Sequence, residues 1–195
     1  MSAPLANAAP PRLSTDEAQA VLQRWIADGE AANVRMLRAG PGVAAPGQWA
    51  GKTGREQMQA MLSGDLPFAP IAQTLDFTLL EVSPGTALFQ GQPGPAHFNP
   101  MGSVHGGWFA TLLDSALGCA VHTMMPAGRG YTTAELSVNF VRALSPKVGR
   151  VRAEGKVIHC GRQLATAEAR LFGPDGTLFA HATTTCLVFE MPASR

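Results

Sequence analysis

One carboxylate stands alone in a long apolar segment. Between Phe98 and Gly128 the only formally charged residue is Asp114, and the sequence around it reads HGGWFATLLDSALGCAVHTMM. An unpaired charge is costly to bury. Such an aspartate is therefore either a partly exposed, hydrogen-bonded helix residue or a group that gives nucleophilic assistance in a reaction. Its type and its apolar surroundings make Asp114 the first candidate for chemistry.

A second candidate lies just upstream, where a loop that runs from Asn99 to Gly107 (NPMGSVHGG) leads into the same segment. If that segment is helical, the amides near Gly106 and Gly107 lack intrahelical partners and lie at the positive end of the helix dipole. Amides in this position can stabilise a developing oxyanion. Nucleophilic assistance and oxyanion stabilisation can thus come from one helix and its preceding loop.

The spacing of these two features requires a second copy of the chain. Gly106 and Asp114 are eight residues apart, which corresponds to roughly 12 Å along a helix, so one reacting carbonyl cannot contact both. Two antiparallel helices related by a twofold axis would place Gly106 of one opposite Asp114 of the other, with two equivalent sites per dimer. We therefore expect a homodimer or a dimer of dimers.

The elements that position these residues follow from hydrophobic periodicity. Residues 15–38 form an amphipathic helix that begins at a capping box, a glycine- and proline-rich linker follows it, and residues 54–63 form a second helix. Alternating segments at 77–82 and 86–90 predict two strands before the long helix, and four more strands follow it. Short links make these strands antiparallel neighbours.

Rows of alanine on one face of this sheet allow the single long helix to lie close against it. We predict an α+β fold in which an antiparallel sheet wraps around one central helix. Residues 1–50 are expected to form an N-terminal helical extension, whose end is disordered, and residues 51–195 the main domain.

Composition excludes several classes of protein. Lys and Arg number 15 against 14 Asp and Glu, so a net charge of +1 indicates neither nucleic-acid nor anionic-membrane binding. The apolar segment contains an aspartate, two histidines and three glycines, which argues against a membrane span. Charged residues make up only 15% of the chain, which favours a surface covered by another subunit.

The cysteines and the N-terminus bear on the compartment. Cys119, Cys160 and Cys186 form no CxxC pair, so neither a disulfide framework nor a zinc ribbon is expected. The segment Met1–Pro11 lacks the pattern of a secretory signal, and we expect a cytoplasmic protein with free thiols. The histidines have no spacing typical of metal ligands, so no metal is predicted.

The segment from Asn99 to Asp114 resembles the hot-dog-fold acyl-CoA thioesterases of the phenylacetic-acid-degradation (PaaI-like) type, in the 4-hydroxybenzoyl-CoA thioesterase superfamily. The shared pattern is an asparagine, a glycine loop, His-Gly-Gly and an aspartate eight residues beyond the first glycine of that pair. The strand at 132–142 (TTAELSVNFVR) is also similar. The resemblance covers about residues 65–190 and implies the hot-dog fold and thioester hydrolysis.

By this resemblance, Asp114 is the general base or the nucleophile, and the Gly106 N–H polarises the thioester carbonyl. Asn99 holds the water or the carbonyl, while His105 orients the loop and contacts the thioester. Thr133 or its neighbour Thr132 assists the water, and the choice between them stays open. The substrate is an acyl-CoA, whose coenzyme A is the only cofactor-like group expected. Gly107 and Arg162 are further substrate-binding candidates, Arg162 through a phosphate.

Two other functions remain open at this point. A hot-dog hydratase or dehydratase would pair a catalytic histidine with an acidic residue in motifs that this sequence lacks. A non-catalytic acyl-CoA-binding module would have no need of both Asp114 and the His-Gly-Gly loop, although fold alone does not settle function. Tight binding of acyl-CoA without turnover would favour that module.

Overall fold

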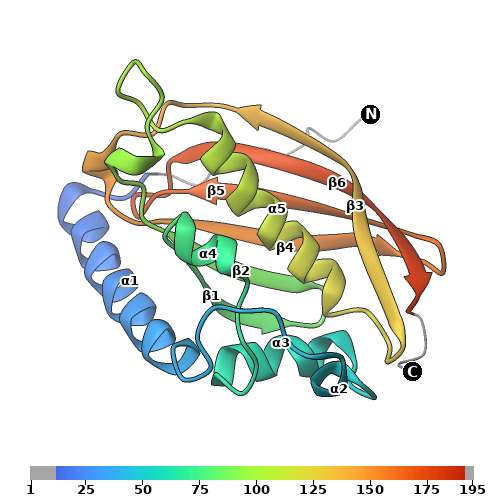
Figure 1. The fold of residues 1–195 in the computed structure, drawn as a ribbon. Helices are drawn as coiled ribbons and strands as arrows, with labels where there is room; N and C mark the ends of the chain where they lie inside the picture. The colour runs from blue at the N-terminus through green and yellow to red at the C-terminus, as the bar shows by residue number, and fades with distance from the viewer. Residues whose placement is uncertain (1–11, 192–195) are drawn as a thin grey trace, which may run out of the picture.

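The computed structural model describes residues 12–191, which form one antiparallel sheet wrapped around a long helix (Figure 1). The six strands lie in the order β1-β2-β4-β5-β6-β3. Their bounds are β1 Phe77–Ser83, β2 Thr86–Gly91, β3 Arg129–Phe140, β4 Val151–Cys160, β5 Leu164–Phe172 and β6 Leu178–Glu190. The helices are α1 Thr15–Met36, α2 Pro46–Trp49, α3 Gly54–Ser63, α4 Pro70–Thr74 and α5 Gly106–His122, with 3-10 turns at Pro95–His97 and Pro146–Val148.

This architecture confirms the predicted α+β hot-dog fold. The helices expected at 15–38 and 54–63 are α1 and α3, whereas the short helices α2 and α4 were not predicted. The predicted boundary after residue 50 falls between α2 and α3 and stays a prediction, and the expected disordered end lies outside the described residues. Within the described part of the chain, no helix combines the length and the hydropathy that crossing a membrane requires.

Small side chains let the sheet approach α5 closely, as the alanine rows predicted. Ala153, Ala167 and Ala182 are at most 1% exposed, and they face Leu113 and the other buried leucines of α5 within one core. At Gly155 a Cβ atom would lie 2.2 Å from the Ala116 carbonyl oxygen, so only glycine fits there. The close approach holds α5 rigidly and thereby sets where its polar residues point.

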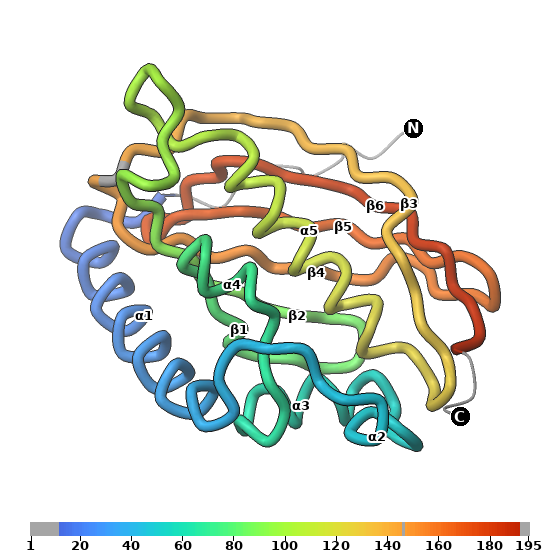
Figure 2. Tube along the Cα trace, in the orientation of Figure 1, coloured from blue at the N-terminus to red at the C-terminus, as the bar shows by residue number. Residues whose placement is uncertain are grey.

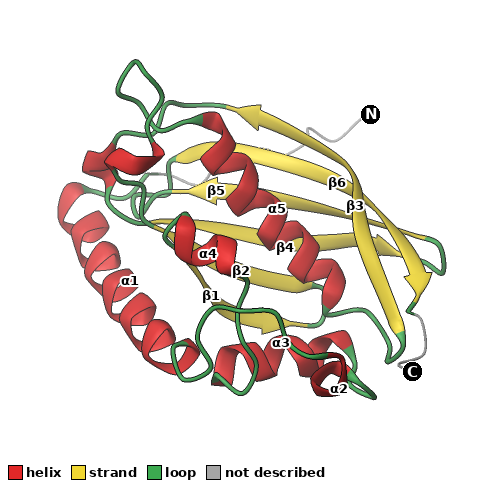
Figure 3. Cartoon of the chain, in the orientation of Figure 1, coloured by secondary structure: helices red, strands yellow, loops and turns green. Residues whose placement is uncertain are grey.

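The N-terminal extension packs against the β1 side of the sheet. Figure 3 shows α1, α3 and α4 around β1, with which all three are in contact. The Arg152 guanidinium is 2.6 Å from the Asp28 carboxylate and lies 4.5 Å above the Trp25 ring. Gln90 Nε2 donates to the Trp25 carbonyl over 2.8 Å. Arg152 is thus engaged in holding α1.

The opposite edge of the sheet is formed by β3, which pairs with β6 alone in the described structure. The trace in Figure 2 shows β3 running along the outside of the sheet, past the side of α5. Most of its residues are exposed, including Phe140 at 57%. A long unpaired edge of this kind is a surface on which another strand can add.

Helix α3, which follows the extension, is attached directly to the C-terminal end of α5. The Gly54 N–H donates to the Met125 carbonyl over 2.9 Å, and the Thr53 side chain caps α3 by accepting from the Glu56 N–H. The contact is so close that a Cβ atom on Gly54 would lie 1.8 Å from the His122 carbonyl oxygen.

Replacing Gly54 by alanine should therefore lower the free energy of unfolding by about 1–3 kcal/mol, because backbone atoms must move to admit the methyl group. Gly47→Ala is the matched control, since Gly47 lies in α2 and a methyl group added there would have no other atom within 4 Å. Urea denaturation of both variants measures the difference. Equal stability of the two variants would show that α3 does not rest on α5 as described.

Candidate functional site

Asp114 projects from the middle of α5 toward the inner side of β3. Its Oδ1 accepts a hydrogen bond from Thr133 Oγ1 over 3.1 Å. Thr132 also lines the space beside Asp114, but the bond to the carboxylate comes from Thr133. Asp114 is half-buried, because the helix carries it past the edge of the leucine-filled core. The structure thus joins two of the predicted residues in one hydrogen-bonded pair.

The loop before α5 is organised by Asn99. Its Oδ1 accepts from the Met101 N–H at 2.9 Å and from the Ser103 N–H at 3.2 Å, and its Nδ2 donates to Ser103 Oγ at 2.8 Å. Within this chain Asn99 therefore shapes the turn that leads into the helix. The side-chain atoms of Asn99 are thus bonded within the loop, whereas the sequence predicted that they hold the water or the thioester carbonyl.

His105 is the N-cap of α5. Its Nδ1 accepts from the Gly107 N–H over 2.8 Å, and its own N–H donates to the His97 carbonyl over 2.8 Å. The Gly107 amide, a predicted substrate contact, is consequently already engaged. Among the described residues the Gly106 N–H has no acceptor, so the helix presents this one amide at its positive end.

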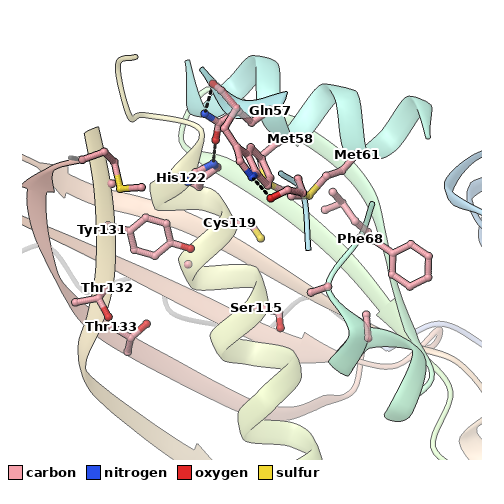
Figure 4. Close-up of a pocket in the computed structure, with 18 of the residues that line it drawn as sticks. Gln57, Met58, Met61, Phe68, Ser115, Cys119, His122, Tyr131, Thr132 and Thr133 are labelled. Atoms are coloured by element: carbon pink, nitrogen blue, oxygen red, sulfur yellow. Dashed lines mark hydrogen bonds between the residues drawn. The ribbon is translucent and has the colours of Figure 1, made fainter. Parts of the chain in front are cut away.

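A cavity of about 1040 Å³ lies beside α5, between β3 and the segments around α3, and residues of β1 and β2 also line it. Figure 4 shows Ser115, Cys119 and His122 along the helix, with Tyr131, Thr132 and Thr133 of β3 to one side. Across the helix the cavity is bounded by residues of α3 and the segments around it, most of them apolar. They are Met36, Ala44, Pro46, Trp49, Gln57, Met58, Met61, Phe68 and Ala72.

Burial favours the uncharged forms of Cys119, Tyr131 and His122 in this cavity. Desolvation, aided by the nearby Asp114 charge, raises the pKa of Cys119 to about 12, so its thiol stays protonated and is a poor nucleophile. Desolvation also raises the pKa of Tyr131 well above its usual value and lowers that of His122. His122 Nε2 is 2.7 Å from Gln57 Oε1. Asp114 is the one carboxylate among the described cavity residues.

The structure places Arg162 away from the cavity lining, exposed in the turn between β4 and β5. Its carbonyl accepts a hydrogen bond from Arg129 Nη2, and Arg129 itself lines the cavity. Sequence reasoning did not select Arg129, although it is the first charged residue after the apolar segment. It also missed Trp49, Met58 and Met61, because nothing local indicates that α2 and α3 come close to α5.

The profile described as the thioesterase superfamily matches residues 101–180, the part of the chain that carries Gly106, Asp114 and Thr133. A solved structure described as a protein from the thioesterase superfamily is 32% identical, with a TM-score of 0.54 over 61% of this chain and 89% of that one. This chain belongs to the thioesterase superfamily. The extension that borders the cavity lies outside the matched residues.

A curated protein with a similar sequence supports the same assignment. A Halobacterium salinarum protein described as a candidate esterase is 34% identical over 84 residues, which are 42% of this chain and 54% of that protein. The chain thus matches about half the length of this curated relative.

Solved structures show the same fold and confirm the PaaI-like resemblance. A variant of the phenylacetic acid degradation protein PaaI from Thermus thermophilus is 28% identical, with a TM-score of 0.55 over 60% of this chain and 97% of that one. A phenylacetic-acid-degradation-related protein from Ralstonia eutropha is also 28% identical, with a TM-score of 0.61 over 66% and 97%.

Proposed function

We propose that this protein is an acyl-CoA thioesterase whose active site is shared between two protomers. The observation that carries the proposal is the Asp114–Thr133 pair at the side of a large apolar cavity, on the same helix whose first amide, that of Gly106, is free. A carboxylate and an aimed amide donor are what hydrolysis of a thioester requires.

In the proposed reaction Asp114 accepts a proton from a water molecule as the water oxygen attacks the thioester carbonyl. Thr133 holds the carboxylate in place, and the partner's Gly106 donates its N–H to the carbonyl oxygen as that oxygen becomes negative. The C–S bond then breaks, and the proton held by Asp114 passes to the departing thiolate. Alternatively, Asp114 attacks the carbonyl itself and water hydrolyses the resulting anhydride; the same residues serve both routes.

Two features support the dimer. Gly106 and Asp114 lie at different heights of one continuous helix, about 12 Å apart, so a single protomer cannot bring both to one carbonyl. The exposed β3 edge is long enough to pair with its own copy about a twofold axis, which would bring two α5 helices together. Coenzyme A enters only as part of the substrate.

The test is release of free thiol from a panel of acyl-CoAs by the full-length protein, with the solution mass measured by light scattering. We expect turnover by a dimer or a dimer of dimers. Tight acyl-CoA binding without thiol release would contradict the proposed hydrolysis and identify a binding module. A strictly monomeric active protein would contradict the shared site.

A further inference from the structure

The side of the cavity opposite β3 is built by a part of the chain that the superfamily match does not include. Met58 and Met61 of α3 and Trp49 of α2 line the cavity, and residues 101–180 contain none of them. Figure 4 shows Met58 and Met61 on α3, across the cavity from β3. We call Trp49, Met58 and Met61 the α3 wall.

The α3 wall is held in place by hydrogen bonds that Gln57 and Trp49 make. Gln57 Oε1 is bonded to His122 Nε2, and Gln57 Nε2 donates to the Lys52 carbonyl over 3.1 Å. Trp49 Nε1 donates to the Ala44 carbonyl over 3.1 Å. With the Gly54–Met125 backbone bond, these contacts attach the wall to α5. Since its polar atoms are engaged in this way, the wall offers the cavity thioether and aromatic surface.

The length of the cavity and the chemistry of its lining indicate which kind of ligand it binds. From Asp114 to His122 the helical floor of the cavity extends for about 12 Å. Apolar surface covers most of the lining, and neither Asp, Glu, Lys nor Arg belongs to the α3 wall. Burying a hydrocarbon chain against such a surface is favourable by roughly 25 cal/mol for each Å² removed from water. Against the α3 wall, a polar or charged acyl group would lose its hydration without gaining partners.

We propose that the α3 wall binds the acyl group, that the substrates are acyl-CoAs with apolar acyl chains of medium length, and that Met61 limits that length. This inference rests on the thioesterase function proposed above. Met61 is the best position to examine, because it is half-buried at the cavity surface whereas Met58 is only 2% exposed and belongs to the core.

The first test compares kcat/KM for butyryl-, hexanoyl-, octanoyl-, decanoyl-, dodecanoyl- and palmitoyl-CoA. In Met61→Phe the longest acyl group that the wild type accepts should lose roughly tenfold in kcat/KM, while butyryl-CoA changes little. In Met61→Ala the optimum should move to a longer chain. Met124→Phe and Met124→Ala are matched controls, since Met124 is 41% exposed and does not line the cavity.

The second test does not depend on hydrolysis. Calorimetric titration of the wild type and the Met61 variants with free fatty acids of the same lengths should show the same chain-length shift in Kd. If both Met61 variants change all lengths equally in either measurement, the inference is overturned while the thioesterase function stands. If the wild type releases no thiol, the proposed function fails. The fatty-acid affinities alone then decide whether the α3 wall limits the length of the bound chain.

Discussion

Replacing Asp114 by asparagine should lower kcat for acyl-CoA hydrolysis by roughly 10²–10⁴-fold, the range typical of a lost general base. An amide of the same shape cannot accept a proton from water, and it cannot attack the thioester as a carboxylate does. It can still accept the hydrogen bond from Thr133, which is 3.1 Å from Oδ1. The variant should therefore fold normally and bind acyl-CoA with nearly unchanged affinity.

The measurement is thiol release under saturating substrate, together with thermal denaturation of each protein. Glu168→Gln is the matched control, because this carboxylate is exposed on β5 and does not line the cavity. Its kcat should equal that of the wild type. Equal rates in the Asp114→Asn protein and the wild type would remove Asp114 from the mechanism.

Replacing Gly106 by proline should lower kcat by roughly 10²–10³-fold, the cost of removing one oxyanion donor. Proline lacks the N–H, yet it suits the first position of a helix. The preceding residue, His105, has φ −65° and ψ 137°, a conformation that is favourable before proline. The substitution thus deletes the donor while α5 keeps its start.

Gly106→Ala is the control for steric effects. A Cβ atom at this position lies 3.1 Å from Phe140 Cζ, so alanine and proline both crowd the same ring, but only alanine retains the amide. We expect Gly106→Ala to keep most of its activity, measured by the same thiol-release assay. A loss as large as that of proline would assign the effect to Phe140 and argue against the amide.

Mixing the two inactive proteins tests whether the site is shared. In a dimer of one Asp114→Asn and one Gly106→Pro protomer, one of the two sites receives both intact groups. Random reassociation should therefore restore about a quarter of the wild-type activity, because half of the dimers are mixed and each has one working site. No recovery after confirmed subunit exchange would contradict a shared site.

Much of the fold was predictable because its local patterns agree with its tertiary structure. The capping boxes at Ser14 and Thr53 form as expected and start α1 and α3. Alternation predicted the strands, and the alanine rows predicted close packing on α5. The prediction that short links make successive strands neighbours is wrong for β3, which pairs with β6 and not with β4. The placement of β3 depends on pairing between residues that are far apart in the sequence.

The candidate site was predictable in part. The sequence showed both the lone carboxylate Asp114 and the His-Gly-Gly loop, because residue type and spacing are enough to recognise them. The sequence did not show which amide stays free, because the Gly107 N–H donates to the side chain of His105 only when that residue caps the helix. Nor could the sequence distinguish Thr133 from Thr132, since the bulge in β3 between Thr133 and Glu135 alters the alternation of side chains there.

By itself the sequence determined the residue types of the candidate site and the helix that carries them, because these follow from local spacing and helix geometry. It also predicted that two copies of the chain share the site, which stays a prediction. Only the tertiary structure decided that Thr133 meets Asp114 and that α2 and α3 close one side of the cavity. Met61 and Asp114 are 53 positions apart in the chain. Their common cavity exists because α3 packs on the end of α5 through a glycine that leaves no room for a side chain.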